Sequence, residues 1–158
     1  MFFLLCPLLA EKGPGLFNLT KLNNYMPTEK AVLLSIIEIG GYPDFSALYE
    51  DCGYQVIKTD SVRKAVKLIR QYKPEVMVAE FNFQSDFRDR TSSLETLMSS
   101  MQGVTDASVI VFYEKESELQ YQRFLQNFKV FASLTFPIKE NELQTALQAI
   151  SRLAGGDK

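Results

Sequence analysis

Three glutamates stand at or near the ends of apolar runs of strand length, and they are the side chains best placed to do chemistry: Glu38, Glu80 and Glu114. If the runs are parallel strands, their carboxyl ends share one edge of a sheet, where open wound sheets bind ligands. Three carboxylates there could hold Mg²⁺, Mn²⁺ or Ca²⁺, which prefer oxygen ligands. The alternative is that Glu114 points into solvent and only two acids meet.

Composition excludes several kinds of catalysis. The 158-residue chain has no histidine, so it has no histidine base, histidine metal ligand or phosphoaccepting histidine. Cys6 and Cys52 are far apart and form no metal or redox spacing, as expected of free thiols in a reducing cytoplasm. No Walker A loop, dinucleotide fingerprint or nucleophile elbow is present. We therefore predict a protein that is not an enzyme, with no catalytic residue and no cofactor.

From residue 30 onward, apolar runs alternate with amphipathic segments. We expect strands at residues 31–37, 54–59, 75–81, 108–113 and 131–135. Helices are expected after Asp44, after a cap at Asp60 or Ser61, around Leu94, over residues 118–128, and after Glu140 or Asn141. Alternating strands and helices predict an α/β fold with a single doubly wound, five-stranded parallel sheet.

The chain ends are expected to lie outside this domain. We divide the sequence into a poorly structured leader over residues 1–28, a domain over 29–153 and a tail over 154–158. The apolar start of the leader is too short to span a bilayer and lacks the basic residues of a signal peptide. The alternative is a hydrophobic anchor or a segment that docks on a partner.

Four segments carry a resemblance to a known family: residues 50–56, 73–76, 77–82 and 132–138. In order and spacing they resemble response regulator receiver (CheY-like) domains of two-component signal transduction, over about residues 30–151. The resemblance implies a (βα)5 flavodoxin-like fold. It also implies a phosphoacceptor pocket at the carboxyl edge of the sheet.

Position by position, that pocket departs from the family pattern. The phosphoacceptor aspartate matches Glu80, and the acidic pair that holds Mg²⁺ matches Ile37 and Glu38. The threonine or serine matches Tyr113, and the lysine matches Phe136. With a backbone ligand at Asn82 and the retained proline, the degenerate pocket comprises Glu38, Glu80, Asn82, Tyr113, Phe136 and Pro137.

These replacements predict a pseudo-receiver that is not phosphorylated. Phosphoryl transfer needs Mg²⁺ and a cation to neutralise the phosphate oxygens, and Phe136 supplies no cation. We expect no metal; if one bound, its ligands would be Glu38 and Glu80. Glu80 can be interpreted as a mimic of a phosphorylated aspartate or as a surviving acid at a strand end, and the missing cation favours the second.

Aromatic residues crowd the segment from the fourth strand to the fifth. The resemblance implies a partner surface on the fourth helix, fifth strand and fifth helix. There we predict partner contacts through Tyr121, Phe124, Phe128 and Phe136, and core positions for Phe112 and Phe131. The alternative is a repacked core. The basic stripe over residues 63–73 is interpreted as the solvated face of a helix.

We therefore predict a cytoplasmic signalling module that works by protein–protein contact without phosphorylation, including a homodimer through the face just named. Net charge of −2 and the absence of a DNA-reading module predict no nucleic-acid or membrane partner. Two alternatives remain open. One is an acidic-site response regulator that binds a divalent metal or is phosphorylated, and the other is an enzyme on a wound α/β fold without a known motif.

Overall fold

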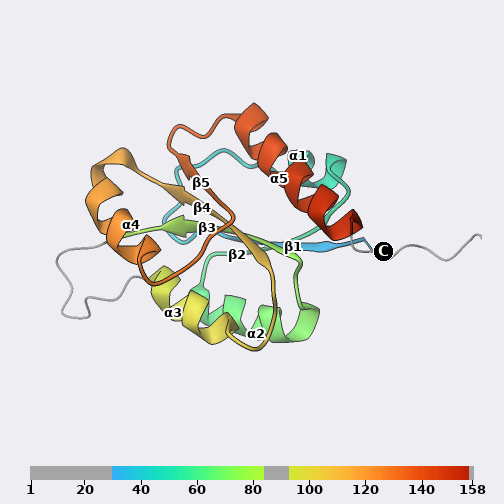
Figure 1. The fold of residues 1–158 in the computed structure, drawn as a ribbon, viewed down its shortest axis with the longest axis horizontal. Coiled ribbons are helices and arrows are strands. Elements are labelled where there is room, and N and C mark those ends of the chain that lie inside the picture. Colours follow the sequence, from blue (N-terminus) through green and yellow to red (C-terminus); the bar gives the residue numbers. More distant parts are fainter. Residues whose placement is uncertain (1–29, 84–92, 157–158) are drawn as a thin grey trace, which may run out of the picture.

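The computed structural model describes residues 30–83 and 93–156. Its centre is a parallel sheet in the order β2-β1-β3-β4-β5 (Figure 1). The strands are β1 (Val32–Ile36), β2 (Gln55–Thr59), β3 (Val76–Phe81), β4 (Ser108–Tyr113) and β5 (Ala132–Thr135). The predicted fold class, a doubly wound five-stranded α/β sheet, is confirmed.

Helices cover both faces of the sheet. Figure 1 shows α1 (Ser46–Asp51) and α5 (Glu140–Gly155) on one side and α2 (Val62–Tyr72) and α3 (Ser93–Met101) on the other. A short 3-10 turn, η2 (Lys115–Ser117), leads into α4 (Glu118–Leu125), whose buried side chains join the core of the α2 and α3 face. No helix in residues 30–83 and 93–156 is both long and apolar enough to cross a membrane.

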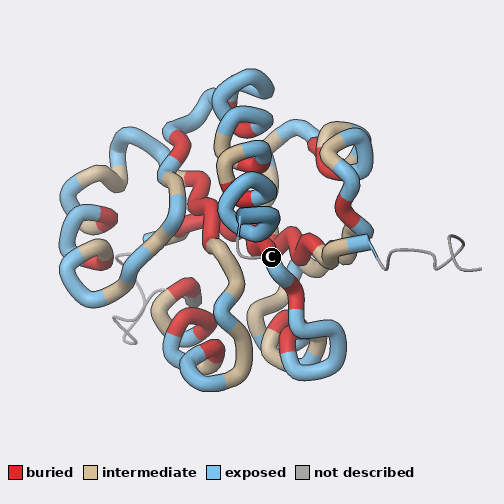
Figure 2. Tube along the Cα trace, turned by 45° about the vertical axis from the view of Figure 1, so that its right-hand side comes forward, coloured by how far each residue is buried: buried red, intermediate tan, exposed pale blue. Residues whose placement is uncertain are grey.

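The three inner strands are buried on both faces, which explains their nearly continuous apolar runs (Figure 2). Successive side chains of a strand point to opposite faces of the sheet. Leu34 and Ile36 therefore lie in the core under α2 and α3, and Leu33 lies in the core under α1 and α5. All six residues of β3 are buried, so Glu80 is a carboxylate set into a strand that has no solvated face. The edge position of β2 agrees with its more polar sequence.

Two helix ends differ from the predicted ones. Helix α4 ends at Leu125 because residues 126–128 continue as a turn, in which the N–H of Asn127 donates to the carbonyl of Phe124 (3.0 Å). Helix α5 continues to Gly155, into the predicted tail, because Ala154 favours a helix and the chain leaves it only at glycine. The predicted leader, residues 1–28, lies outside the described residues.

Candidate functional site at the carboxyl edge of the sheet

Glu80 is a buried acid whose carboxylate holds the segment that follows β1. Its side chain lies near the end of β3, and the residue is 5% exposed. The Oε1 atom accepts hydrogen bonds from the backbone N–H groups of Glu38 (2.8 Å) and Ile39. Since β3 and β1 are neighbours in the sheet, this contact fastens the β1–α1 segment to the centre of the sheet. One of the two carboxylate oxygens of Glu80 is thus occupied as the acceptor for two backbone N–H groups.

Two glycines shape the segment that wraps around this carboxylate. Gly40 and Gly41 have φ angles of +85° and +88°, a region that side-chain-bearing residues rarely adopt. A Cβ atom at either position would meet nothing within 4 Å, so glycine is needed for the backbone conformation and not for space. The Gly-Gly pair therefore directs successive N–H groups toward Glu80, an arrangement suited to binding an anion.

Burial raises the pKa of Glu80 above its usual value of 4.5. The N–H groups of Ile39, Glu38 and Gly40 act in the opposite direction, because they stabilise the charged form, and the nearby Glu38 carboxylate raises the pKa further. Desolvation outweighs the hydrogen bonds. Glu80 is thus an acid whose ionisation is opposed by its surroundings, and no ion pair to it is found among residues 30–83 and 93–156.

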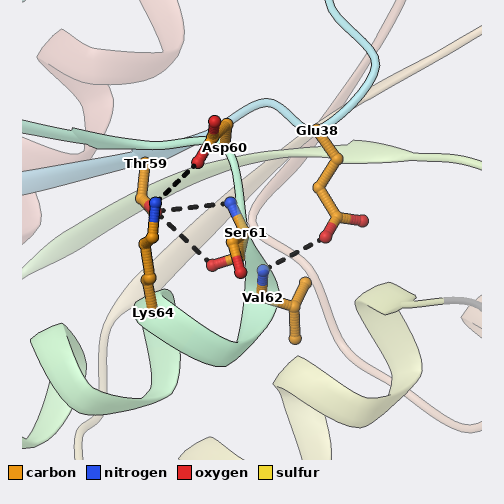
Figure 3. Close-up of polar contacts among 6 residues, drawn as sticks. All are labelled: Glu38, Thr59, Asp60, Ser61, Val62 and Lys64. Atoms are coloured by element: carbon orange, nitrogen blue, oxygen red, sulfur yellow. Dashed lines mark hydrogen bonds and ion pairs between the residues drawn. The ribbon is translucent and has the colours of Figure 1, made fainter.

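The Glu38 carboxylate caps helix α2. Its Oε1 accepts a hydrogen bond from the N–H of Val62, the first residue of the helix (3.1 Å; Figure 3). Ser61 occupies the N-cap position but makes no side-chain cap bond, and Asp60 instead pairs with Lys64 (3.4 Å). The predicted N-cap position at Ser61 is confirmed, but the side chain that caps the helix is Glu38 and not Ser61 or Asp60. The reason is that β1 and β2 end side by side, which brings Glu38 to the helix from another strand.

Replacing Glu38 by alanine is expected to lower the free energy of unfolding by about 1 kcal/mol, the usual effect of losing a helix N-cap. Glu38→Gln keeps an oxygen acceptor for the Val62 N–H and is expected to cost less. Urea unfolding measures the difference, and amide hydrogen exchange at Val62 should accelerate in the alanine variant alone. Equal stability of the wild type and Glu38→Ala would show that the carboxylate does not cap α2.

The structure brings two acids together at this edge, not three. Glu114 is exposed, in agreement with the alternative in which only two of the three acids meet. Within the described ranges, no group of three or more His, Cys, Asp or Glu side chains could hold a metal ion. Glu38 and Glu80, the two residues named as ligands if a metal bound, accept hydrogen bonds from backbone N–H groups.

Aromatic rings occupy the position where the resemblance places a lysine. Phe136 is 44% exposed and packs edge-on against Tyr42, with ring centroids 5.6 Å apart. Tyr42 in turn contacts Phe112 at 5.4 Å. Burial raises the pKa of Tyr42 to about 12, and the carboxylates of Glu80 and Glu114 contribute to the shift. The Phe136–Pro137 peptide bond is cis, and both residues are exposed.

Tyr113, which matches the hydroxyl residue at the end of the fourth strand, uses its hydroxyl elsewhere. Its ring stacks on Tyr121 with centroids 4.3 Å apart. Hydrogen bonds from Gln122 and from the Tyr113 hydroxyl lower the pKa of Glu118 on α4. Asn82 is only partly buried. Among the six predicted pocket residues, Glu80 accepts the N–H of Glu38, and the N–H of Phe136 donates to the carbonyl of Tyr113 (2.9 Å).

Two of the four predicted partner contacts lie in the core. Tyr121 is 0% exposed and Phe124 is 2% exposed, so neither can touch a partner at the surface. The Tyr121 hydroxyl bonds to Ser133 (2.6 Å), and its ring packs against Phe81. Phe128 is partly buried against Phe124. The sequence did carry a sign of this burial. Positions 121, 124 and 128 have the spacing of one face of a helix, and in an amphipathic helix the apolar face is the buried one.

Other apolar side chains at the surface were not predicted. Phe131 is 38% exposed, so its expected core position is wrong, whereas Phe112 is buried as predicted. Ile39, Phe83 and Leu119 are exposed by 37–63%. Sequence reasoning missed these three because each lies between polar or glycine-rich neighbours, where an isolated apolar residue is unremarkable. All three follow the carboxyl ends of the neighbouring strands β1, β3 and β4, and this neighbourhood is known only once the order of the strands in the sheet is known.

Comparison with known proteins identifies the fold. No protein-family model matches the sequence, and no curated protein does. A response regulator receiver domain from Clostridium thermocellum superposes with a TM-score of 0.61 at 17% identity, covering 78% of this chain and 97% of that one. The chain has the receiver fold.

Two further receiver-sized structures agree. The N-terminal domain of an uncharacterized Wolinella succinogenes protein gives a TM-score of 0.65 at 16% identity and covers 81% of this chain and 99% of its own. The receiver domain of a Francisella response regulator gives 0.59 at 18% identity and covers 79% and 99%. At these identities the similarity establishes the receiver fold alone, because a fold hosts many activities.

Proposed function

We propose that this receiver-fold protein is a signalling module that works without phosphorylation, through contact with a protein partner. The observation that carries the proposal is the use of both carboxylates at the expected phosphorylation site. Glu80 accepts the N–H groups of Glu38 and Ile39, and Glu38 accepts the N–H of Val62. Mg²⁺ or a phosphoryl group would have to compete with these backbone donors for the two carboxylates.

The charge balance of the site supports the same proposal. Phosphoryl transfer depends on cations that neutralise the equatorial oxygens. Phe136 and Tyr42 instead place an apolar surface where the family has a lysine. A carboxylate that mimics phosphoaspartate would need the same cation. The geometry therefore favours a structural role for Glu80, which holds the β1–α1 segment through backbone hydrogen bonds, over a role as a phosphate mimic.

Exposed apolar residues give the proposed partner a surface. Seven large hydrophobic side chains are exposed among the described residues, and four of them follow β1, β3, β4 and β5 at the carboxyl edge of the sheet. We call these four the carboxyl-edge patch: Ile39, Phe83, Leu119 and Phe136. An apolar edge is poorly suited to phosphate chemistry and well suited to a protein contact.

The partner is therefore expected on the carboxyl edge and not across the broad α4–β5–α5 face. Burial of Tyr121 and Phe124 removes the aromatic centre that the predicted homodimer face would need. Phe136 is the residue common to the predicted face and the carboxyl-edge patch. A second copy of the chain and a different protein are distinguished by the experiment that follows.

A photo-reactive amino acid at position 136 is expected to cross-link the full-length protein to one defined partner in cells that naturally produce it. The same amino acid at position 153 is the matched control, because Leu153 is 69% exposed but lies at the other end of α5. Mass spectrometry of the adduct tells a second copy from another protein. The adduct should also form when phosphodonors are depleted. Equal cross-linking from both positions, or loss of the adduct on depletion, would overturn the proposal.

A further inference from the structure

A cavity of about 380 Å³ opens between α1 and the carboxyl ends of β1 and β2. Aromatic rings form much of its wall: Tyr42, Phe45, Tyr49 and Phe112. Glu80 is not among its lining residues, so the cavity is distinct from the acid site, although Tyr42 borders both. Its volume lies in the range of small-molecule sites, which are typically mostly apolar with a few placed polar groups.

Two hydroxyl-bearing side chains in the wall have no hydrogen-bond partner among the described residues. Ser35 is 7% exposed and Tyr49 is 2% exposed, and both line the cavity. Neither hydroxyl oxygen is sealed from solvent, since among the described residues the buried side-chain atom without a partner is Oε1 of Gln120, so both hydroxyls open into the cavity. Burial raises the pKa of Tyr49, so its hydroxyl stays protonated and can donate. Two hydroxyls that bond to no described protein group are therefore accessible to a polar molecule inside an aromatic cavity.

The charges at the cavity mouth are already paired. Lys58 of β2 contacts Asp44 at 3.0 Å, and Asp60 pairs with Lys64 on the outer side. A charged ligand would find no free opposite charge there, and burying an unpaired charge is costly. The interior suits a neutral molecule with a flat ring that packs on the aromatic wall and with polar atoms for the two hydroxyls.

We propose that this cavity binds a small neutral aromatic molecule carrying hydrogen-bonding groups, the size of a phenol or a single nucleobase. The ring contacts Phe45 and Phe112, and its polar atoms bond to the hydroxyls of Ser35 and Tyr49. Neither the carboxyl-edge patch nor Glu80 supplies a lining residue, although Tyr42 in the cavity wall packs against Phe136 of that patch.

Benzamide is a suitable probe because it is flat, neutral and carries both a donor and an acceptor. Titration of the full chain, followed by backbone amide NMR, is expected to give saturable shifts at Ser35, Tyr49 and Thr59. Toluene has the same ring without polar groups, and benzoate has it with a charge. Both are expected to bind at least severalfold more weakly. Equal affinities for all three probes, or shifts centred elsewhere, would overturn the proposal.

Ser35→Ala and Tyr49→Phe each remove one hydroxyl while keeping the wall, and each is expected to weaken benzamide binding about fivefold. Toluene binding should not change. Tyr54→Phe is the matched control, because the Tyr54 hydroxyl bonds to Ser151 (3.0 Å) away from the cavity. Both cavity variants should fold, since neither hydroxyl has a protein partner to lose. Unchanged benzamide affinity in both cavity variants would contradict the assignment of the hydroxyls to the ligand.

Discussion

Replacing Tyr121 by alanine is expected to lower the free energy of unfolding by about 3–5 kcal/mol, the range for removing a large buried ring. Tyr121 is fully buried, stacks on Tyr113 at 4.3 Å and packs against Phe81 at 5.1 Å. The alanine variant would leave a cavity between β3, β4 and α4 that these rings cannot fill. Urea unfolding followed by circular dichroism measures the loss.

Two controls separate the ring of Tyr121 from its hydroxyl and from its helix. Tyr121→Phe removes only the hydrogen bond to Ser133 and is expected to cost about 1 kcal/mol. Leu119→Ala changes a side chain that is 63% exposed on the same helix and should stay within about 0.5 kcal/mol of the wild type. If Tyr121→Ala cost as little as Leu119→Ala, the ring would be a surface residue after all.

Glu80→Ala is expected to lower the free energy of unfolding by about 2–4 kcal/mol, because it leaves the N–H groups of Glu38 and Ile39 without their acceptor. Glu80→Gln keeps an oxygen for these groups and removes the charge. At neutral pH the glutamine variant should be at least as stable as the wild type, since it avoids the cost of ionising a buried carboxylate. A phosphate mimic would show the opposite order.

The pH dependence of the same pair gives an independent test. Burial raises the folded-state pKa of Glu80 above its unfolded value of 4.5, so the folded protein binds this proton more tightly. Stability from this group is complete below the unfolded pKa and is lost as the pH rises through the folded pKa. Glu80→Gln has no such titration, and its advantage over the wild type should grow with pH across this window. Urea unfolding at several pH values would reveal a constant or shrinking advantage if this account is wrong.

The sequence predicted the strands and the class of fold because burial on both faces leaves a direct signal. Residues 75–81 read as a nearly continuous apolar run, and the corresponding strand β3 is buried throughout. The meeting of Glu38 and Glu80 also followed from sequence, because parallel strands that are neighbours end at the same edge. Their chemical use did not follow, since it depends on which backbone N–H groups the Gly40–Gly41 turn brings to the carboxylate.

The aromatic segment shows a second limit. Composition cannot tell a partner surface from a core, because both are rich in Tyr and Phe. Helical spacing predicts that Tyr121 and Phe124 are buried, as they are in the structure. Phe131 and Phe136 lie in short connections, where no periodic pattern can predict burial. The cap on α2 was beyond sequence reasoning for a related reason, because its acceptor Glu38 comes from 24 residues away in the chain.

The most direct test of the central claim is backbone amide NMR of the full chain during titration with Mg²⁺, alone and then with beryllofluoride. We expect no saturable shift at Glu38, Ile39, Glu80 or Asn82 at millimolar Mg²⁺, with or without beryllofluoride, because the Glu80 carboxylate stays bonded to its backbone donors. Saturable shifts at these four amides that grow when beryllofluoride is added would contradict the central claim and show a working acidic site.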